Sequence, residues 1–442
     1  MQKKILAAAV AALCGVTTTT AVAQSNESKV QLWGIADAAI RHTNNEGANK
    51  GGLTKMLGGG MSQSRWGIKV EEDLGGGSKA LVELENRFTL DNGETPVGAT
   101  PFFQLAYVGL QGPYGRLTMG RQWNVLFDVV SSTYASFPYS PYMEAYKPEL
   151  GMAVAARSSN TLKYLLATPD RKFVGALQYS FGEGAKVNPA TSFSAMQNAG
   201  LDASGMGQNI ASTLPGALLS QNWAKHVSSV ASSIKQVGGF ARYSSDGISA
   251  GGGYLKSTLP GGSKLDAWTL GGSYRKDKIY LNIGYGENKF KLTNQKGGQG
   301  PGGAIPVTQL VDLSILSDLW GGQTNGGFQP GMLSGALSPI NANKRKMYKI
   351  GFGYQITPSI NVGAHYYHAK QSGSVDGSYN GKADFLVAAL NYTFSKRTDA
   401  YFAVDHTKLN GGSGMALQNK NQTGGVNVTK RTGVTIGLRH RF

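Results

Sequence analysis

The sequence is poor in cysteine, in charged side chains and in long hydrophobic runs. Cys14 is the only cysteine among 442 residues, and charged residues make up 16% of the chain, against roughly 25% in soluble globular proteins. No apolar run reaches the roughly 18 residues that a transmembrane helix needs, which excludes a bundle of such helices. A single thiol also excludes a disulfide framework and zinc held by several cysteines.

Glycine, aromatic residues and positive charge are abundant instead. The chain has 62 Gly, 20 Tyr and 16 Phe, and 43 Lys+Arg against 26 Asp+Glu, for a net charge of +17. The glycines follow no three-residue period, which excludes collagen. A hydrophobic content of 40% is too high for a disordered chain. The composition indicates a folded chain without a helix-rich block.

Residues 1–23 have the layout of a secretory signal peptide. Lys3 and Lys4 supply the positive start, an apolar stretch too short to span a membrane follows, and Ala21-Val22-Ala23 gives the cleavage pattern. We expect cleavage between Ala23 and Gln24. Cleavage would remove Cys14 with the signal peptide. It would also remove Lys3 and Lys4, which lowers the net charge of the chain to +15.

The expected mature chain, residues 24–442, is dominated by a two-residue hydrophobic period. In 278–286, Ile279, Leu281, Ile283 and Tyr285 alternate with polar residues or glycine. Such alternation gives a strand one apolar and one polar face. About sixteen such segments are predicted, at 30–43, 64–74, 78–90, 102–112, 115–124, 157–168, 173–183, 234–244, 248–256, 265–274, 278–290, 344–357, 359–371, 382–394, 398–410 and 429–442.

The connections between these segments alternate between long and short. Short ones are Gly- or Pro-rich turns such as 75–77, whereas 125–156, 184–233 and 291–343 are long. Strands of 10–14 residues exceed the usual soluble length of about 5–6 and match a tilted membrane crossing of about 9–11. The pattern therefore predicts an all-β, transmembrane antiparallel β-barrel with lipid-facing aromatic girdles. A soluble β-sandwich with core aromatics is the alternative.

Several segments resemble the trimeric general porins of Gram-negative outer membranes, especially those of β-proteobacteria. They lie in the first strand, the second hairpin, the fourth to sixth strands and the C-terminus. They are 32–37, 64–69, 72–77, 106–110, 120–122, 160–164 and 437–442. The resemblance implies sixteen strands per subunit, a homotrimer in the cell outer membrane and a third loop folded into the pore. It also implies that Phe442 is the C-terminal signal read by the barrel-insertion machinery.

The same resemblance assigns residues to a pore constriction. Pro148-Glu149-Leu150-Gly151 resembles the family's third-loop motif, so Glu149 takes its acid, with Glu144 near the position of a second acid. On the wall, Arg65 and Arg157 match the family's arginines. Independently, the aromatic residues of 125–156 favour burial of this segment inside the barrel, because large exposed apolar patches are rare.

Alternation adds two lysines to this set. Along a strand, residues separated by an even number of positions share a face. Arg65 and Lys69 therefore share the face opposite to Trp66, and Arg157 and Lys163 share the face opposite to Leu162. All four are expected to face the lumen. Opposed charges across a narrow aqueous gap create a transverse field that favours polar solutes. For Lys69 and Lys163, an ordinary solvated lumen side chain is the simpler interpretation.

The function predicted is passive diffusion of small hydrophilic solutes and ions, with an anion preference suggested by the positive charge. A substrate-selective channel, with Tyr280 and Tyr367 toward the lumen, is the main alternative. An outer-membrane enzyme or adhesin is a further one, but no nucleophile, metal or phosphate-binding motif occurs among the six histidines or the glycines. We expect no cofactor and no nucleic-acid partner. Outer-membrane lipids and lipopolysaccharide are expected to contact the barrel.

Overall fold

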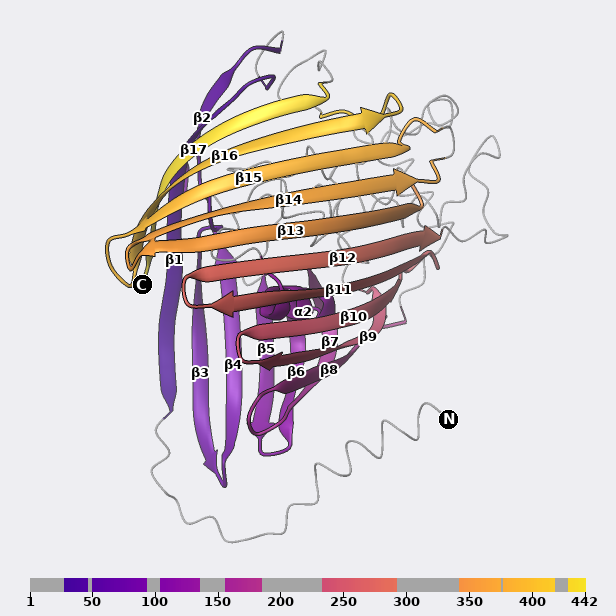
Figure 1. Cartoon of the computed structure of the whole chain (residues 1–442). Coiled ribbons are helices and arrows are strands. Elements are labelled where there is room, and N and C mark those ends of the chain that lie inside the picture. Colours follow the sequence, from indigo (N-terminus) through magenta and orange to yellow (C-terminus); the bar gives the residue numbers. More distant parts are fainter. Residues whose placement is uncertain are drawn as a thin grey trace.

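The computed structural model describes residues 28–46, 50–93, 104–135, 156–184, 233–291, 342–374, 377–417 and 428–442. These residues form strands and one helix, α2, inside the space that the strands enclose (Figure 1). The elements are β1 Lys29–Thr43, β2 Leu53–Leu57, β3 Arg65–Gly75, β4 Ser78–Arg87, β5 Leu105–Gly112, β6 Gly115–Trp123, α2 Val125–Thr133, β7 Arg157–Ala167, β8 Phe173–Ser180, β9 Lys235–Ser245, β10 Ile248–Thr258, β11 Lys264–Lys276, β12 Ile279–Lys291, β13 Lys344–Thr357, β14 Ile360–Ser372, β15 Gly381–Thr393, β16 Thr398–Gly411 and β17 Lys430–Arg441.

The strands close into one antiparallel barrel. From β3 onward each strand pairs with the next, and β17 returns to pair with β1 from Ile35↔Arg441 to Thr43↔Gly433. β2 and β3 both pair with β1, at its two ends, and together occupy one place in the wall. The wall therefore has sixteen places, which confirms the predicted fold class. Closure pairs the backbone groups that an open sheet edge would expose to lipid.

Two elements were not predicted from the sequence. β2 is a five-residue fragment, too short for alternation to be distinguished from a loop. α2 lies in the aromatic segment 125–156, where the apolar residues suggested burial without a defined period. Asn124 caps this helix by accepting a hydrogen bond from the N–H of Phe127 at 2.9 Å.

The two faces of the barrel differ as alternation predicts. Outward side chains such as Ile350 and Leu386 are 58% and 49% exposed, whereas their inward neighbours Lys349 and Val387 are buried. Outward aromatic rings contact one another in a row: Trp268 with Tyr285 at 5.2 Å, and Tyr285 with Tyr348 at 4.8 Å between centroids. This arrangement is typical of the aromatic girdle of an outer-membrane barrel.

Among the described residues, no helix is long and apolar enough to cross a membrane.

The C-terminal residue Phe442 extends the pairing of β17 with β1 by one position. The backbone N–H of Phe442 donates to the carbonyl of Gly34, and the N–H of Gly34 donates back to the carbonyl of Phe442, both at 3.0 Å. A Cβ on Gly34 would lie 2.2 Å from the Phe442 ring, so only glycine leaves room for this ring. Phe442 is 47% exposed on the outer face.

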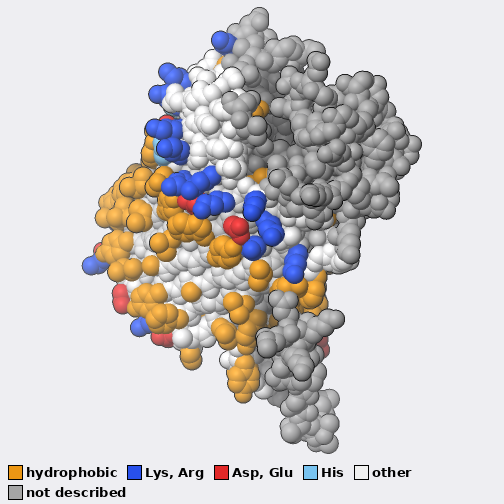
Figure 2. Space-filling model, turned by 90° about the vertical axis from the view of Figure 1, so that its right-hand side faces the viewer, with side chains coloured by type: hydrophobic (Ala, Val, Ile, Leu, Met, Phe, Trp, Pro, Cys, Tyr) orange, Lys and Arg blue, Asp and Glu red, His pale blue; other side chains and the backbone are white. Residues whose placement is uncertain are grey.

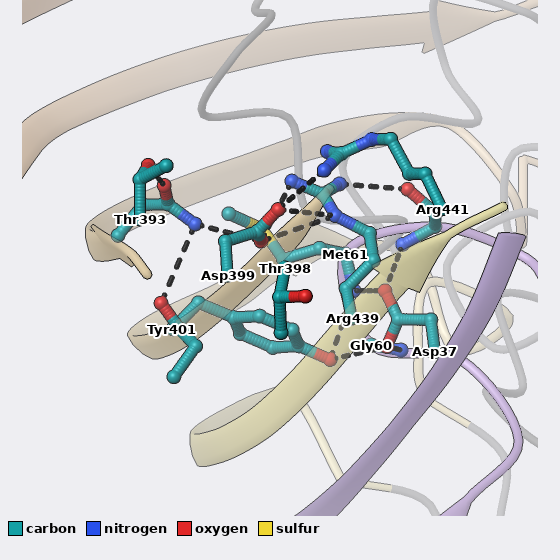
Figure 3. A network of polar contacts seen from close by, with 12 residues as sticks. Asp37, Gly60, Met61, Thr393, Thr398, Asp399, Tyr401, Arg439 and Arg441 are labelled. Atoms are coloured by element: carbon teal, nitrogen blue, oxygen red, sulfur yellow. Dashed lines mark hydrogen bonds and ion pairs between the residues drawn. The ribbon is translucent and has the colours of Figure 1, made fainter. Parts of the chain in front are cut away.

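A polar network fixes the break between β2 and β3 (Figure 3). Seven residues, 58–64, stand opposite three residues of β1, and the backbone N–H groups of Gly60 and Ser62 donate to the Asp37 carboxylate at 3.0 and 2.7 Å. The Tyr401 hydroxyl donates to the same carboxylate at 2.6 Å. Asp37 is fully buried, so these donors replace the water that its charge has lost.

Candidate functional site

Two of the predicted arginines meet at a carboxylate on the inner wall. Arg65 on β3 has its Nε 4.0 Å from an oxygen of Glu85, and Arg157 on β7 has a terminal nitrogen 3.4 Å from the other oxygen. Glu85 on β4 is only 2% exposed. One buried carboxylate therefore serves two guanidinium groups, and the cluster carries excess positive charge.

Glu85 was missed by the sequence analysis, although a signal for it was present. Glu83, Glu85 and Arg87 alternate with Val82, Leu84 and Asn86, which places the charged side chains on the inner face of β4. The family resemblance implies acids on the third loop and none on the wall, so it does not point to Glu85.

Aromatic rings hold the two arginines in place. The guanidinium carbon of Arg157 lies 3.4 Å from the ring centroid of Trp123, and Trp123 stacks on Phe127 of α2 at 3.7 Å. Arg65 lies 5.9 Å from the ring of Trp33. Cation–π contacts of this kind restrict a long side chain without neutralising its charge.

The two predicted lysines have different environments. Lys69 is 48% exposed along its side chain and lies 3.4 Å from Glu83. Lys163 contacts Asp128 of α2 at 2.7 Å and donates to the carbonyl of Trp123 at 2.9 Å. Lys163 therefore joins the wall to α2, and its charge is matched by a carboxylate.

The regular alternation of inward and outward side chains is interrupted between Arg157 and Lys163. Asn160 has a φ of 52°, and the pairing of β6 with β7 shifts register between Gly120 and Gln122. Such a bulge changes which residues face inward. The contact with Glu85, rather than alternation, is what brings Arg157 to the Arg65 cluster.

α2 packs against the inner wall formed by β8 to β11. Val125, Leu126 and Val129 are buried in a cluster with Phe240, Leu255 and other wall residues. Gly253 lies beneath Val129, where a Cβ would come within 3.2 Å of it. A Cβ on Gly251 would likewise lie 3.1 Å from the Thr133 hydroxyl, so these two glycines of β10 make room for the helix.

Tyr134 and Ala135 continue from α2 along the inner wall toward β13. A Cβ on Gly271 or Gly284 would lie within 2.4 or 2.6 Å of the Tyr134 ring, so the two glycines form a slot for it. The carbonyl of Tyr134 accepts from Lys349 on β13 at 2.5 Å, and that of Ala135 accepts from the Tyr280 hydroxyl at 2.6 Å. The start of the segment 125–156 is therefore fixed inside the barrel.

Other predicted site residues fall outside the described part of the chain. Glu149 and Glu144 do so, as do Ala23 and Gln24. The two tyrosines expected to face the lumen of a substrate-selective channel are both engaged: the Tyr280 hydroxyl donates to the carbonyl of Ala135, and Tyr367 is 2% exposed. Within the described ranges, no group of three or more His, Cys, Asp or Glu side chains could hold a metal ion.

A second set of inner arginines lies near the β17–β1 junction and is closely paired. Arg41 contacts both oxygens of Asp405, at 2.6 and 2.9 Å. Arg439 and Arg441 share Asp399, at 3.0 and 2.6 Å (Figure 3). Arg439 also donates to the Ser62 hydroxyl at 2.7 Å, which ties it to the segment 58–64.

The chain and its barrel fold resemble known proteins. A family model described as Gram-negative porin matches residues 7–412. An outer membrane porin protein of Bordetella pertussis is 26% identical over 466 residues, and outer membrane porin protein 32 of Delftia acidovorans is 26% identical over 458; each alignment covers 100% of both chains.

Solved structures share the fold. The anion-selective porin from Comamonas acidovorans has a TM-score of 0.60 at 20% identity, covering 94% of this chain and 100% of that one. The trimer form of OmpT of Vibrio cholerae has a TM-score of 0.57 at 10% identity, covering 94% and 99%. The chain is an outer-membrane channel and not an enzyme, and it belongs to the Gram-negative porin family.

Proposed function

We propose that this porin is a passive diffusion channel for small hydrophilic solutes and ions that prefers anions. The observation that carries the anion preference is the cluster in which Arg65 and Arg157 share Glu85. Two cations against one carboxylate leave a positive potential at the wall, which raises the local concentration of anions. The similar fold of the anion-selective Comamonas porin is consistent with this preference.

The opposite side of the constriction would be formed by Glu149 and Glu144. Their carboxylates would face Arg65 and Arg157 across the pore and create a transverse field. Lys69 would add positive charge along the same wall, because its side chain is half exposed. Lys163 would act differently, by holding α2 against β7 through Asp128.

The assembly proposed is a homotrimer exported through the periplasm. Residues 1–23 would be removed between Ala23 and Gln24, leaving 24–442 as the barrel. Phe442, exposed at the end of β17, would be bound by the barrel-insertion machinery. The trimer form of the Vibrio porin gives a precedent for three copies of this fold. The outer face would contact membrane lipids and lipopolysaccharide.

The test is the reversal potential of the purified protein in a planar bilayer under a salt gradient. The natural chain should give a potential of the sign expected for anion preference. The substitutions Arg65→Glu and Arg157→Glu should each move it toward cation preference, because each replaces a positive charge in the cluster by a negative one.

Lys370→Glu is a matched control, since it makes the same charge change on the outer face of β14. Its reversal potential should equal that of the natural chain. If Arg65→Glu and Arg157→Glu leave selectivity unchanged, the cluster around Glu85 does not set ion preference. If the natural chain conducts no ions at all, the diffusion channel itself is rejected.

A further inference from the structure

A band of lysines lies on the outer face, at the strand ends that carry the long connections. On β14, exposed Lys370 lies between buried Ala369 and Gln371, which directs it away from the lumen. Figure 2 shows Lys and Arg side chains gathered along one border of the hydrophobic surface. The outward lysines of β9 to β17 at this end are Lys235, Lys256, Lys264, Lys289, Lys291, Lys344, Lys346, Lys370, Lys382, Lys408 and Lys430.

Register places several of these lysines directly opposite one another. Lys346 pairs with Lys370, and Lys370 pairs with Lys382, so three lysines stand side by side on β13, β14 and β15. Directly opposed residues have Cβ atoms roughly 4.5–5.5 Å apart, and like charges at that distance are destabilising. These three residues are called the outer lysine row. An anion lying over the row would remove the repulsion.

The nearby carboxylates do not neutralise the outer lysine row. Glu287 lies 3.2 Å from Lys344, 3.5 Å from Lys289 and 3.9 Å from Lys346, so one acid is divided among three lysines. Asp384 contacts His368 at 2.7 Å. Across the described ranges, no ion pair joins Lys370 or Lys382 to a carboxylate. Two of the three ammonium groups thus have no anionic partner among the residues that the structure describes.

The row borders the lipid-facing surface. Tyr348 and His368, one outward position further from the strand ends, are in ring contact at 6.1 Å between centroids. Beyond them lie exposed apolar residues such as Ile350 and Leu386. Aromatic rings mark the level where the hydrocarbon of a membrane meets its headgroups. The ammonium groups of the row therefore lie at the level of the headgroups.

We propose that the outer lysine row binds the phosphate groups of a phosphorylated lipid in the outer leaflet. The phosphates lie over Lys346, Lys370 and Lys382, and the acyl chains lie along the apolar face below them. Each lysine donates to phosphate oxygens through its ammonium group, which is suited to a compact anion. This inference deepens the proposal that the barrel contacts lipopolysaccharide, since it assigns the contact to one sector and to phosphate.

The part of the outer face that carries the outward lysines differs from the part formed by other strands. On β3, β4 and β8, the outward positions at this end hold apolar or uncharged polar residues, such as Trp66, Asn86 and Tyr179, and no lysine. The lysines described on those strands face inward or lie at the short-turn end. Phosphate binding is therefore expected on only part of the perimeter.

The test measures thermal unfolding of the folded protein in detergent, with and without added bisphosphorylated lipid A. Lipid that binds only the folded barrel raises its Tm. The triple variant Lys346→Gln, Lys370→Gln and Lys382→Gln should bind roughly 10- to 100-fold more weakly, so the lipid-induced rise should be lost. Without lipid the variant should be at least as stable as the natural chain, because the repulsion between the lysines is removed.

A matched control replaces Lys276, Lys278 and Lys396 with Gln at the short-turn end, and it should keep the full lipid-induced rise. The proposal is overturned if the triple variant keeps that rise, if the control loses it equally, or if dephosphorylated lipid A stabilises the natural chain as well. It is also overturned if inorganic phosphate alone reproduces the effect. Conductance in bilayers should be unchanged in the triple variant, which separates this test from that of the diffusion channel.

Discussion

The inner wall contains two arginine clusters with the same residue types and different surroundings. At the junction of β17 with β1, Arg41 and Asp405 form a pair whose side chains are 4% and 1% exposed. At β3, β4 and β7, Arg65 is 20% exposed and shares Glu85 with Arg157. The Arg41–Asp405 pair in the first cluster is closed off, and its one positive charge is matched by one negative charge. The second is partly open and has more positive than negative charge.

The difference shows that an arginine on a porin wall can either stabilise the closed barrel or influence which ions pass through it. A fully buried pair has little influence on ions in the lumen, but its loss leaves an uncompensated charge in a place without water. A partly exposed cluster with excess charge acts on passing solutes at a smaller cost in stability. Substitutions should therefore separate the two roles, by changing stability in one place and selectivity in the other.

The largest effect is expected at the closed cluster. Asp405→Ala leaves the Arg41 guanidinium buried without its bidentate partner, and losing one member of a buried ion pair typically costs about 3–5 kcal/mol. The midpoint of unfolding in denaturant should fall sharply, measured by the loss of β-sheet circular dichroism. The reversal potential of the molecules that remain folded should not change.

The double variant Arg41→Met with Asp405→Leu is the control for this prediction. Replacing both charges by apolar groups is often close to neutral, so most of the lost stability should return. A double variant as unstable as the single one would mean that the pair does not account for the loss.

The fold could be predicted from the sequence because a membrane barrel repeats one rule. Alternation, strand length and the order of long and short connections predict about sixteen strands with bounds within a few residues of those observed, and the Gly75 to Gly77 turn has the positive φ angles that its glycines allow. The break between β2 and β3 could not be predicted in this way. It depends on Asp37 collecting backbone N–H groups from 58–64, a contact between distant residues with no local period.

The second largest effect is expected at Glu85. Glu85→Gln removes the carboxylate that Arg65 and Arg157 share, and a hydrogen bond to a charged group contributes about 1.5–3 kcal/mol. Stability should fall by an amount in that range. Unlike Asp405→Ala, this change should also shift the reversal potential further toward anions, because the positive charges lose their counter-charge.

Glu83→Gln, two residues away on the same face of β4, is the matched control. Its side chain is more exposed, at 18%, and contacts Lys69 rather than the arginines. Glu83→Gln should change both the stability and the reversal potential clearly less than Glu85→Gln does. A stronger shift of selectivity in Glu83→Gln than in Glu85→Gln would place the selective charge elsewhere on the wall.

The candidate site was only partly accessible to sequence analysis. Arg65 and Arg157 were named because they match family positions, but their meeting point at Glu85 arises from three strands that are far apart in the chain. The slot for Tyr134 was equally hidden, since Gly271 and Gly284 become neighbours only through the pairing of β11 with β12. Alternation tells which way a side chain points, and not which partner it meets.

A third, intermediate effect is expected at this slot. Gly284→Val places side-chain atoms where the Tyr134 ring lies, and overpacking typically costs about 1–3 kcal/mol. The displaced ring should push the end of α2 toward the pore axis, so single-channel conductance should fall. Adding Tyr134→Ala to Gly284→Val should restore conductance. If the double variant conducts as poorly as the single one, the slot does not position this segment.

The smallest effect is expected at Lys69, which tests whether exposure alone decides the role of a lumen charge. Its side chain is half exposed and its contact with Glu83 is open to water, and such pairs contribute about 0–1 kcal/mol. Lys69→Gln should leave the unfolding midpoint nearly unchanged and reduce anion preference slightly, by less than Arg65→Gln does under the same salt gradient. Because Lys69 is more exposed than Arg65, a larger shift in Lys69→Gln would show that the most solvent-exposed charge, rather than the partly exposed cluster around Glu85, controls the field in the pore.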